Sequence, residues 1–491
     1  MTRSLHFLVH AVMDESTIAH SIGMPEYSYY FVMQDFIPLL ERIGRVTVLK
    51  NPENEIESIF KKSQESGDEC LFLNFTAPQN FIDGLQCPTI HVFAWEFDTI
   101  PTESWLQDGR QDWRVALRQH KSAITHSEYA KSAILEAMGQ EFPVAVVPSP
   151  VWDKQDLGRS VIDKRNPIKS ADLHFVGRFF DTRQIEMFYD IGTFRSGRSL
   201  LSNPAPKESE AESHSQNVTR RLVKQLIPPI VWNAFAPSPG QATQSDADRN
   251  SARATDPEDT DRVSYTTERA NTLALEGVVY TSIFNPLDGR KNWQDMVSAF
   301  IWAHKERSDA ILLIKTPKLD VHDFVEPLIE FLKRFQPFNC RVVILKAFLD
   351  DDQFQALREA TTFYVNTSYG EGQCLPLMEY LSAGIPAIAP STTALGDYIE
   401  SDIAFVVDAH AEPSTWQHDP RLSYRALRYR VDWLELVDAF EQSYHLARND
   451  APAWRAMGTA AASRLKDHCS LDKTELVLRQ FLETVDQKTT I

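Results

Sequence analysis

Short apolar runs alternate with amphipathic stretches through the first part of the chain. The apolar runs lie at residues 5–11, 45–50, 70–75, 89–95, 122–127 and 144–149. Between them, residues 28–44 and 128–139 carry apolar side chains at helical spacing. Strands that alternate with helices are typical of parallel-sheet units. We therefore predict a Rossmann-like, doubly wound α/β domain over residues 1–160.

The same alternation returns near residue 271. Apolar runs lie at 277–285, 310–316, 341–348, 361–368, 385–390 and 403–408, and helical patterns lie at 292–306, 323–335 and 351–360. These predict a second Rossmann-like domain over 271–430, followed by helices over 431–491. Ligands of open parallel sheets bind at the carboxyl ends of the strands, and the cleft between two such domains is the default site.

Residues 161–270 interrupt this pattern and are predicted to be an insertion or linker. The part between about 195 and 262 is rich in polar residues, and 240–262 contains no large apolar side chain. Such a segment cannot bury enough surface to offset its ordering entropy, so we predict disorder there. An apolar and basic piece at 220–235 has two interpretations that stay open. It packs on a domain, or it makes a peripheral contact with a membrane surface.

The net charge, the apolar stretches and the cysteine content of the chain disfavour several classes of protein. The 491 residues carry a net charge of -18, with a pI near 5.3, whereas a nucleic-acid binder normally shows a basic footprint. The first residues read as a strand rather than a signal peptide, and no apolar stretch is long enough to span a membrane. Five scattered cysteines indicate reduced thiols. We expect a cytoplasmic protein without a nucleic-acid partner, and the inner membrane face stays open as a location.

Residues 369–390, YGEGQCLPLMEYLSAGIPAIAP, carry the strongest chemical signal. A strand is predicted before this stretch, and a helix within it, with Pro376 in the first turn and Gly384 as its stop. The start of such a helix presents unpaired N–H groups to an anion. Gly370 and Gly372 let the backbone approach a ligand closely.

Two carboxylates belong to this stretch. Glu371 lies at the helix mouth, and Glu379 lies about two turns along, with its side chain leaning back. Both can face one molecule with an anionic part and hydroxyls, such as a nucleotide sugar. Two simpler interpretations exist: Glu371 complements the helix dipole, and Glu379 is merely solvated.

This stretch resembles the carboxylate signature of retaining glycosyltransferases with the GT-B fold, in particular glycosyltransferase family 4. There, two glutamates separated by seven residues precede a small residue-Gly-x-Pro turn, as in E-GQCLPLM-E and SAGIP here. The resemblance implies two Rossmann-like domains facing a cleft. It implies that Glu371 contacts the donor sugar and that Glu379 holds the ribose hydroxyls. Backbone amides of Gln373, Cys374 and Leu375 would face the diphosphate or the sugar.

A second match lies in YTSIFNPLDGRKNW, residues 280–293. Lys291 corresponds to the family lysine that neutralises the departing diphosphate, and Arg290 is placed to assist it. The family often has an arginine where this chain has Asn285, so one phosphate cation is missing. Arg290 or Lys315 would compensate. The simpler interpretation of this segment is a solvated loop before a helix.

Three further residues are candidates by the same resemblance. Phe348 matches the segment that meets the nucleobase, with core packing as the alternative. Trp95 and Glu96 stand where the family lines the acceptor side of the cleft, and structural roles are equally open for both. His91, in the preceding strand, is expected in the core. Residues 13–28 replace the family's usual Gly-rich first loop.

No metal is expected to be required. Asp246 and Asp248 match an Asp-x-Asp pair, but they lie in the polar insertion without a preceding strand. Asp350 to Asp352 are expected to cap a helix. No GxGxxG opens either domain, which disfavours a dehydrogenase.

The leading hypothesis is therefore a retaining transferase that moves a hexose from a UDP- or GDP-sugar to a glycan, a lipid-linked acceptor or another hydroxyl. The resemblance implies a role in surface polysaccharide synthesis. A non-catalytic nucleotide-sugar-binding or scaffold protein is the alternative, supported by Asn285. An epimerase or phosphorylase of the same fold is a third.

Overall fold

The computed structural model describes residues 4–12, 27–105, 108–155, 159–160, 162–184, 270–317, 324–417 and 419–489. Four predictions fall wholly or mostly outside these ranges. They concern the disorder of 195–262, the 220–235 contact, the loop at 13–28 and the pair Asp246 and Asp248.

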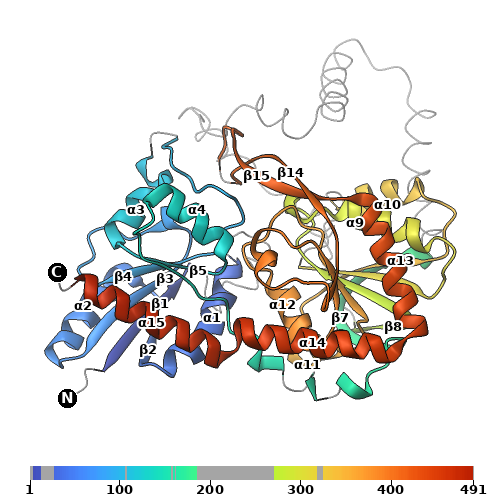
Figure 1. The fold of residues 1–491 in the computed structure, drawn as a ribbon, viewed down its shortest axis with the longest axis horizontal. Coiled ribbons are helices and arrows are strands. Elements are labelled where there is room, and N and C mark those ends of the chain that lie inside the picture. The colour runs from blue at the N-terminus through green and yellow to red at the C-terminus, as the bar shows by residue number, and fades with distance from the viewer. Residues whose placement is uncertain are drawn as a thin grey trace, which may run out of the picture. The chain divides into compact units, whose positions relative to one another are not determined.

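The first domain is a six-stranded parallel sheet, as predicted (Figure 1). Its strand order is β2 (Arg45–Val48), β1 (Leu5–Ala11), β3 (Glu69–Phe75), β4 (Thr89–Val92), β5 (Ala123–Thr125) and β6 (Val144–Val146). Its helices are α1 (Tyr27–Glu41), α2 (Pro52–Glu65), α3 (Trp113–His120) and α4 (Glu128–Met138). The order reverses at β1 and β3, which is the switch point where doubly wound sheets bind ligands.

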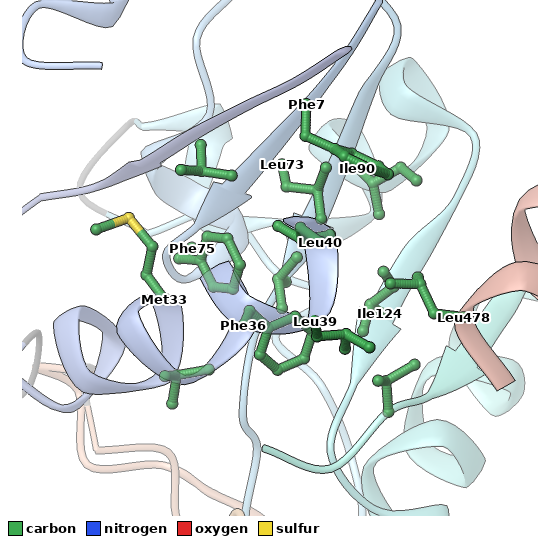
Figure 2. Close-up of a cluster of buried hydrophobic side chains, with 14 of the residues drawn as sticks. Phe7, Met33, Phe36, Leu39, Leu40, Leu73, Phe75, Ile90, Ile124 and Leu478 are labelled. Atoms are coloured by element: carbon green, nitrogen blue, oxygen red, sulfur yellow. The ribbon is translucent and has the colours of Figure 1, made fainter. Parts of the chain in front are cut away.

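A hydrophobic core joins α1 to this sheet. Phe36 on α1 meets Phe75 on β3 edge to face, with ring centroids 5.4 Å apart, a favourable aromatic geometry. Figure 2 shows Leu478, from the far end of the sequence, in the same cluster. Leu478 is fully buried there and Phe481 is 8% exposed. The core of the first domain therefore includes residues from the last helix.

The second domain is a seven-stranded sheet. Its strand order is β13 (Ala404–Val406), β12 (Ala387–Ala389), β11 (Phe363–Val365), β8 (Ala270–Ile283), β7 (Lys169–Asp181), β10 (Arg341–Ala347) and β9 (Ala310–Thr316), with an added β8–β9 pairing. Its helices are α9 (Trp293–His304), α10 (Glu326–Lys333), α11 (Asp351–Glu359) and α12 (Leu375–Ser382). All pairings are parallel except those of β7. The predicted two-domain α/β architecture is confirmed by this strand order.

The boundary of the linker differs from the prediction. Residues 161–270 were expected to lie outside both domains, but β7 is an antiparallel strand of the second sheet. Buried and exposed side chains largely alternate along β7, which is a period-two signal for a half-buried strand. Arg341 anchors its end through a buried ion pair with Asp181 at 2.7 Å.

A hairpin and three helices follow the second sheet. The hairpin strands are β14 (Ala409–Thr415) and β15 (Tyr424–Val431), and the helices are α13 (Trp433–Asn449), α14 (Ala451–Cys469) and α15 (Leu471–Thr489). The predicted helical tail is confirmed. Helix α14 places Ala461 and Leu465 in a core of the second domain, and α15 places Leu478 in the core of the first.

All five cysteines are free thiols, in line with the prediction. Across the described residues, the helices include none with the length and apolar character that crossing a membrane requires.

Candidate functional site

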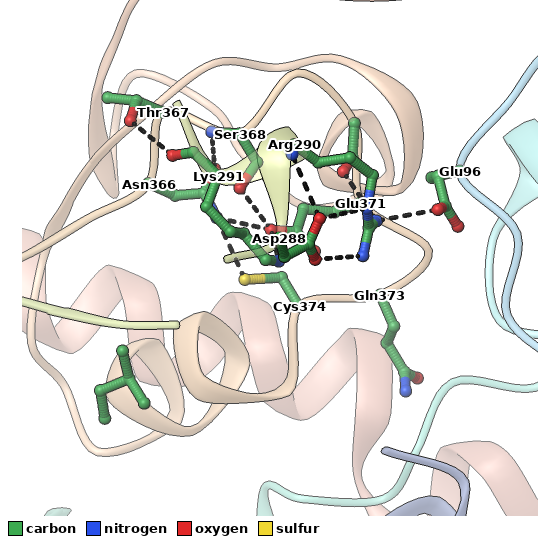
Figure 3. Close-up of polar contacts among 12 residues, drawn as sticks. Glu96, Asp288, Arg290, Lys291, Asn366, Thr367, Ser368, Glu371, Gln373 and Cys374 are labelled. Carbon is green, nitrogen blue, oxygen red and sulfur yellow. Dashed lines mark hydrogen bonds and ion pairs between the residues drawn. The ribbon is translucent and has the colours of Figure 1, made fainter. Parts of the chain in front are cut away.

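Two loops meet at the carboxyl ends of neighbouring strands. β8 and β11 pair in parallel, so their following loops leave the same edge of the sheet. The backbone N–H of Tyr369, after β11, donates to the carbonyl of Arg290, after β8, at 2.8 Å. This contact joins the two predicted motifs. Figure 3 shows Arg290 and Lys291 of one motif beside Glu371 of the other.

Lys291 and Glu371 form an ion pair at the centre of the site. The Lys291 ammonium lies 2.7 Å from Glu371 Oε1, and the two side chains are 16% and 7% exposed. Burial alone would lower the pKa of Lys291, but the Glu371 charge and other acidic neighbours outweigh it, and the pKa is raised. Burial would raise the pKa of Glu371, yet Lys291 and Arg290 hold it lowered. Both groups are therefore charged near neutral pH.

The same carboxylate receives two further hydrogen bonds. Ser368 donates its hydroxyl to Glu371 Oε1 at 2.6 Å, and Asn366 donates its amide at 3.2 Å. The backbone N–H of Glu371 donates to the Thr393 hydroxyl at 3.1 Å. Hydrogen bonds to the ionised form favour it, so these neighbours fix both the charge and the direction of the carboxylate.

Two carboxylates form ion pairs with the Arg290 guanidinium. Asp288 caps the short turn that carries Arg290 and Lys291, and its side chain pairs with the guanidinium at 2.8 Å. Glu96, from the first domain, lies 3.0 Å away on the other side. Burial raises the pKa of Glu96, and the Arg290 charge opposes this. Glu96 therefore lies beside the predicted Arg290–Lys291 motif. In this structure its partner is Arg290, whereas the resemblance placed it on the acceptor side of the cleft.

The two glycines fit against the chain that carries Glu96. A Cβ at Gly372 would lie 2.8 Å from the Ala94 Cβ, and one at Gly370 would lie 3.1 Å from the Glu96 carbonyl oxygen. Real Cβ atoms essentially never approach to the first of these distances. Gly372 is thus required for the close approach of the 94–96 segment to the Glu371 loop, and a side chain at Gly370 would make a tight contact with the same segment.

Helix α12 begins where the sequence indicated. Pro376 lies in its first turn, and Gly384 follows it with a φ of +76°. Cys374 precedes Leu375 in a left-handed conformation, with φ of 63°. Gln373 is turned toward the first domain: its side-chain oxygen accepts from the Ser149 N–H at 2.6 Å, and its amide donates to the Ser149 hydroxyl at 2.9 Å.

Glu379 lies in a different environment from Glu371. It is half-buried, and burial raises its pKa to about 7, helped by the nearby charge of Asp35. Asp35 is itself buried and paired with Lys154. Among the described contacts, none joins Glu379 to Glu371. Both carboxylates belong to one helix-and-loop unit, but the polar contacts of this structure place only Glu371 with Lys291.

Three other predicted residues lie around this centre. Lys315, at the end of β9, is 8% exposed, with its ammonium over the Phe354 ring at 5.2 Å, and burial lowers its pKa to about 8. Asn285 uses its side-chain oxygen to accept from the N–H of Leu287. Phe348 is 71% exposed, so the alternative of core packing is wrong for it.

Trp95 does not offer a face to a ligand in this structure. Its ring is 3% exposed, packs against Phe97 and Trp113, and donates its N–H to the Thr99 carbonyl at 2.8 Å. The structural interpretation is therefore favoured for Trp95. His91 is fully buried, as expected, and Asp350 forms the predicted helix cap, in a capping box with Gln353.

The sequence reasoning missed four residues of the site. They are Asp288, Asn366, Ser368 and Thr393. Asp288 could have been found from its position two residues before Arg290, because Asp is a preferred cap of a helical turn. Asn366 and Ser368 belong to a polar run directly after a strand, which marks a ligand edge of a parallel sheet. Thr393 lies far from Glu371 in the sequence, and no local pattern marks it as a residue of the site.

The space beside the ion pair is small. A cavity of about 10 Å³ is lined by Lys291, Asn366, Ser368 and Glu371, among others, and one water needs about as much. A ligand larger than a water would displace part of the packing around this cavity. Within the described ranges, no group of three His, Cys, Asp or Glu side chains is placed to hold a metal ion.

The matches between this chain and known proteins are all to solved structures. No protein-family profile and no curated protein match the sequence. Among solved structures, the chain is similar to HepE from Anabaena in complex with UDP and glucose, at 11% identity over 99% of each chain, with a TM-score of 0.45. A glycosyltransferase from Rickettsia africae gives 11%, 99% of each chain and 0.46. A trehalose 6-phosphate synthase from Burkholderia multivorans gives 10%, 100% of each chain and 0.48. Since all three TM-scores lie below 0.5, the strand order described above carries the statement about fold.

Proposed function

We propose that this protein transfers a hexose from a nucleotide-diphosphate sugar, UDP- or GDP-linked, to a hydroxyl of a glycan or other acceptor, with retention of anomeric configuration. The observation that carries the proposal is the buried pair of Lys291 and Glu371, built by two loops at one sheet edge, beside the start of α12. A cation next to a helix start suits a diphosphate. An adjacent carboxylate suits sugar hydroxyls.

In this proposal Lys291 exchanges partners when the donor binds. Its ammonium leaves Glu371 for the diphosphate, and the released carboxylate accepts hydrogen bonds from the sugar. Arg290 adds positive charge, although Asp288 and Glu96 already neutralise part of it. Glu379 binds the ribose hydroxyls, and the exposed Phe348 lies near the base. The backbone of Gln373 to Leu375 faces the phosphates.

The transfer step needs no protein nucleophile. The bond between the anomeric carbon and the phosphate oxygen breaks, and the acceptor oxygen bonds to that carbon on the same face. The acceptor proton passes to the leaving phosphate oxygen. Lys291 and the start of α12 stabilise the charge that develops there, and a single such interaction contributes about 10²–10³ in rate. We propose that no metal ion is required, so turnover should persist in excess EDTA.

A thermal-shift screen against UDP, GDP, ADP, dTDP and their hexose conjugates tests the donor site. A ligand at about 100 times its dissociation constant stabilises a protein by about 2.7 kcal/mol, which gives a clear rise in melting temperature. A shift with one base supports the donor site and identifies the nucleotide. No shift with any of them would contradict the proposal.

A second candidate function is a non-catalytic nucleotide-sugar-binding or scaffold protein. It is favoured by one observation: both cations of the motif, Arg290 and Lys291, are already engaged by carboxylates. Release of free nucleotide from donor and acceptor by purified protein distinguishes the two. Donor binding without turnover across an acceptor panel would favour the scaffold.

A further inference from the structure

Two of the five cysteines lie level with each other on neighbouring chain segments of the first sheet. β3 and β4 pair in parallel with Phe72 opposite Thr89, so counting back two residues along each segment brings Cys70 level with Cys87. The Phe72 N–H donates to the Pro88 carbonyl at 2.8 Å, one residue before β4 begins. Neighbouring strands lie about 4.8 Å apart, and disulfide-bonded cysteines have Cα atoms about 4.4–6.8 Å apart. The backbone therefore already has the spacing that a disulfide needs.

The two cysteine side chains also share one face of the sheet. Residues two apart along a strand point the same way, and Cys70, Phe72 and Cys87 pack in one core cluster with α2. The exposed fractions of Cys70 and Cys87 are 6% and 2%. On α2, Glu57 Oε1 accepts the backbone N–H groups of Gln86 and Cys87 at 2.7 and 3.3 Å, which fixes the turn before β4. The two thiols hydrogen-bond to each other.

The surroundings make the two thiols chemically unequal. The hydrogen bond from Cys87 lowers the pKa of Cys70, and the Ser63 hydroxyl and the Arg45 charge act in the same direction, against burial. The hydrogen bond to Cys70 and burial together raise the pKa of Cys87. The Arg45 side chain is 60% exposed, so the Cys70 end of the cluster adjoins the surface. Because the thiolate is the reactive form of cysteine, Cys70 is the nucleophile and Cys87 is the resolving thiol.

We propose that Cys70 and Cys87 are an oxidation site for hydrogen peroxide and close into a disulfide within the first domain. The Cys70 thiolate attacks one peroxide oxygen: an S–O bond forms, the O–O bond breaks and hydroxide leaves. The sulfur is oxidised to a sulfenic acid, and the peroxide is reduced. The Cys87 sulfur then attacks the Cys70 sulfur: an S–S bond forms, the S–O bond breaks, and water leaves with the Cys87 proton. A dithiol reductant reverses the bond. No residue of the Lys291 site takes part, so this step does not rest on the proposed sugar transfer.

The other three cysteines differ from this pair in both respects. Among the described contacts, none joins Cys340, Cys374 or Cys469 to a second thiol, and burial raises the pKa of each to about 12. Cys340 is 3% exposed, a value between those of Cys87 and Cys70. Its reactivity therefore reports what burial alone allows. We expect these three cysteines to stay reduced under conditions that oxidise the pair.

Peptide mass spectrometry of the full chain after brief treatment with hydrogen peroxide tests the pair. The protein is first reduced with dithiothreitol and desalted, and the thiols that remain after peroxide are alkylated with iodoacetamide in denaturant. A peptide that joins Cys70 to Cys87 should form, two hydrogens lighter than the reduced pair, and dithiothreitol should remove it. Cys70 should react at least about tenfold faster than Cys340, since the thiolate fraction changes about tenfold for each unit of pKa.

Three variants separate the two chemical steps. Cys87→Ser should accumulate a sulfenic acid at Cys70, trapped by dimedone, without a cross-link, and Cys70→Ser should form neither product. Cys340→Ser is the matched control and should cross-link like wild type. The proposal is overturned if the wild type yields no cross-linked peptide, if Cys70 reacts no faster than Cys340, or if Cys87 cross-links equally to another cysteine. These three results come from the wild type alone, so they decide even where a variant fails to fold.

Discussion

Replacing Lys291 with methionine removes the cation of the buried pair and leaves the Glu371 carboxylate without its main partner. The two side chains are 16% and 7% exposed, so the buried-pair case applies, in which removal of one partner costs about 3–5 kcal/mol. Ser368 and Asn366 still donate to the carboxylate. We therefore expect the low end, about 3 kcal/mol, measured by urea unfolding at pH 7.

The pH dependence of this loss follows from the pKa of Glu371. In the wild type the pKa of Glu371 is lowered. The carboxylate therefore stabilises the folded state at pH values above its ordinary pKa, and this stabilisation is lost as the pH falls through its pKa in the folded state. In Lys291→Met the buried carboxylate has lost its main cation, its pKa rises, and protonation relieves the cost at low pH. The stability difference should therefore be largest near pH 7 and shrink toward pH 4.

Lys131→Met is the matched control, since Lys131 pairs with Glu128 at the surface, where the side chains are 32% and 61% exposed. Such pairs contribute about 0–1 kcal/mol. A loss below about 1 kcal/mol for Lys291→Met, or an equal loss at pH 4 and pH 7, would refute the reasoning. If the proposed function is correct, the same variant should also lose turnover by about 10²–10³.

Three further substitutions test other parts of the structure. Burial raises the pKa of Glu379 to about 7, so the wild-type protein loses stability as this carboxyl ionises with rising pH. Glu379→Gln cannot ionise and should therefore gain stability relative to wild type as pH rises from 5 to 8. A difference in melting temperature that does not change with pH would contradict this. Gly372→Ala should lose about 1–3 kcal/mol through its clash with Ala94, whereas Gly109→Ala, with nothing within 4 Å, should not destabilise through a clash; equal unfolding curves would count against the close approach. Leu478→Ala should cost about 2–5 kcal/mol and Leu476→Ala, 53% exposed on the same helix, much less; similar losses in chemical denaturation would show that α15 is not part of the first core.

The sequence predicted those features that depend on local pattern. Neighbouring residues determine the strand runs, the start of α12 near Pro376 and its end before Gly384. The structure has each of these features at the predicted position. β7 was missed although its side chains alternate, because 169–181 adjoins the polar segment and its partners, β8 and β10, follow it at a distance in the chain. Local pattern does not contain such pairings.

The candidate site shows the same division. Lys291 and Glu371 were found from motif spacing, and the structure joins them in one contact. The pairing of Arg290 with Glu96 could not be predicted, because it depends on how the 94–96 segment packs against Gly372. The burial of Trp95 follows from Phe97 and Trp113 around it, and aromatic residues serve cores and sugar sites alike.

The position of α15 has a consequence for synthesis of the chain. Domains made on the ribosome generally fold in the order in which they emerge. Here Leu478 lies in a core whose preceding buried residue along the chain is Val147. Roughly 330 residues must therefore be made in between, which takes tens of seconds at ~5–20 residues per second. During that interval the apolar face that later receives α15 is uncovered. The nascent first domain is therefore the stage at which we expect chaperones to bind, and its folding is finished only after the second domain has been translated.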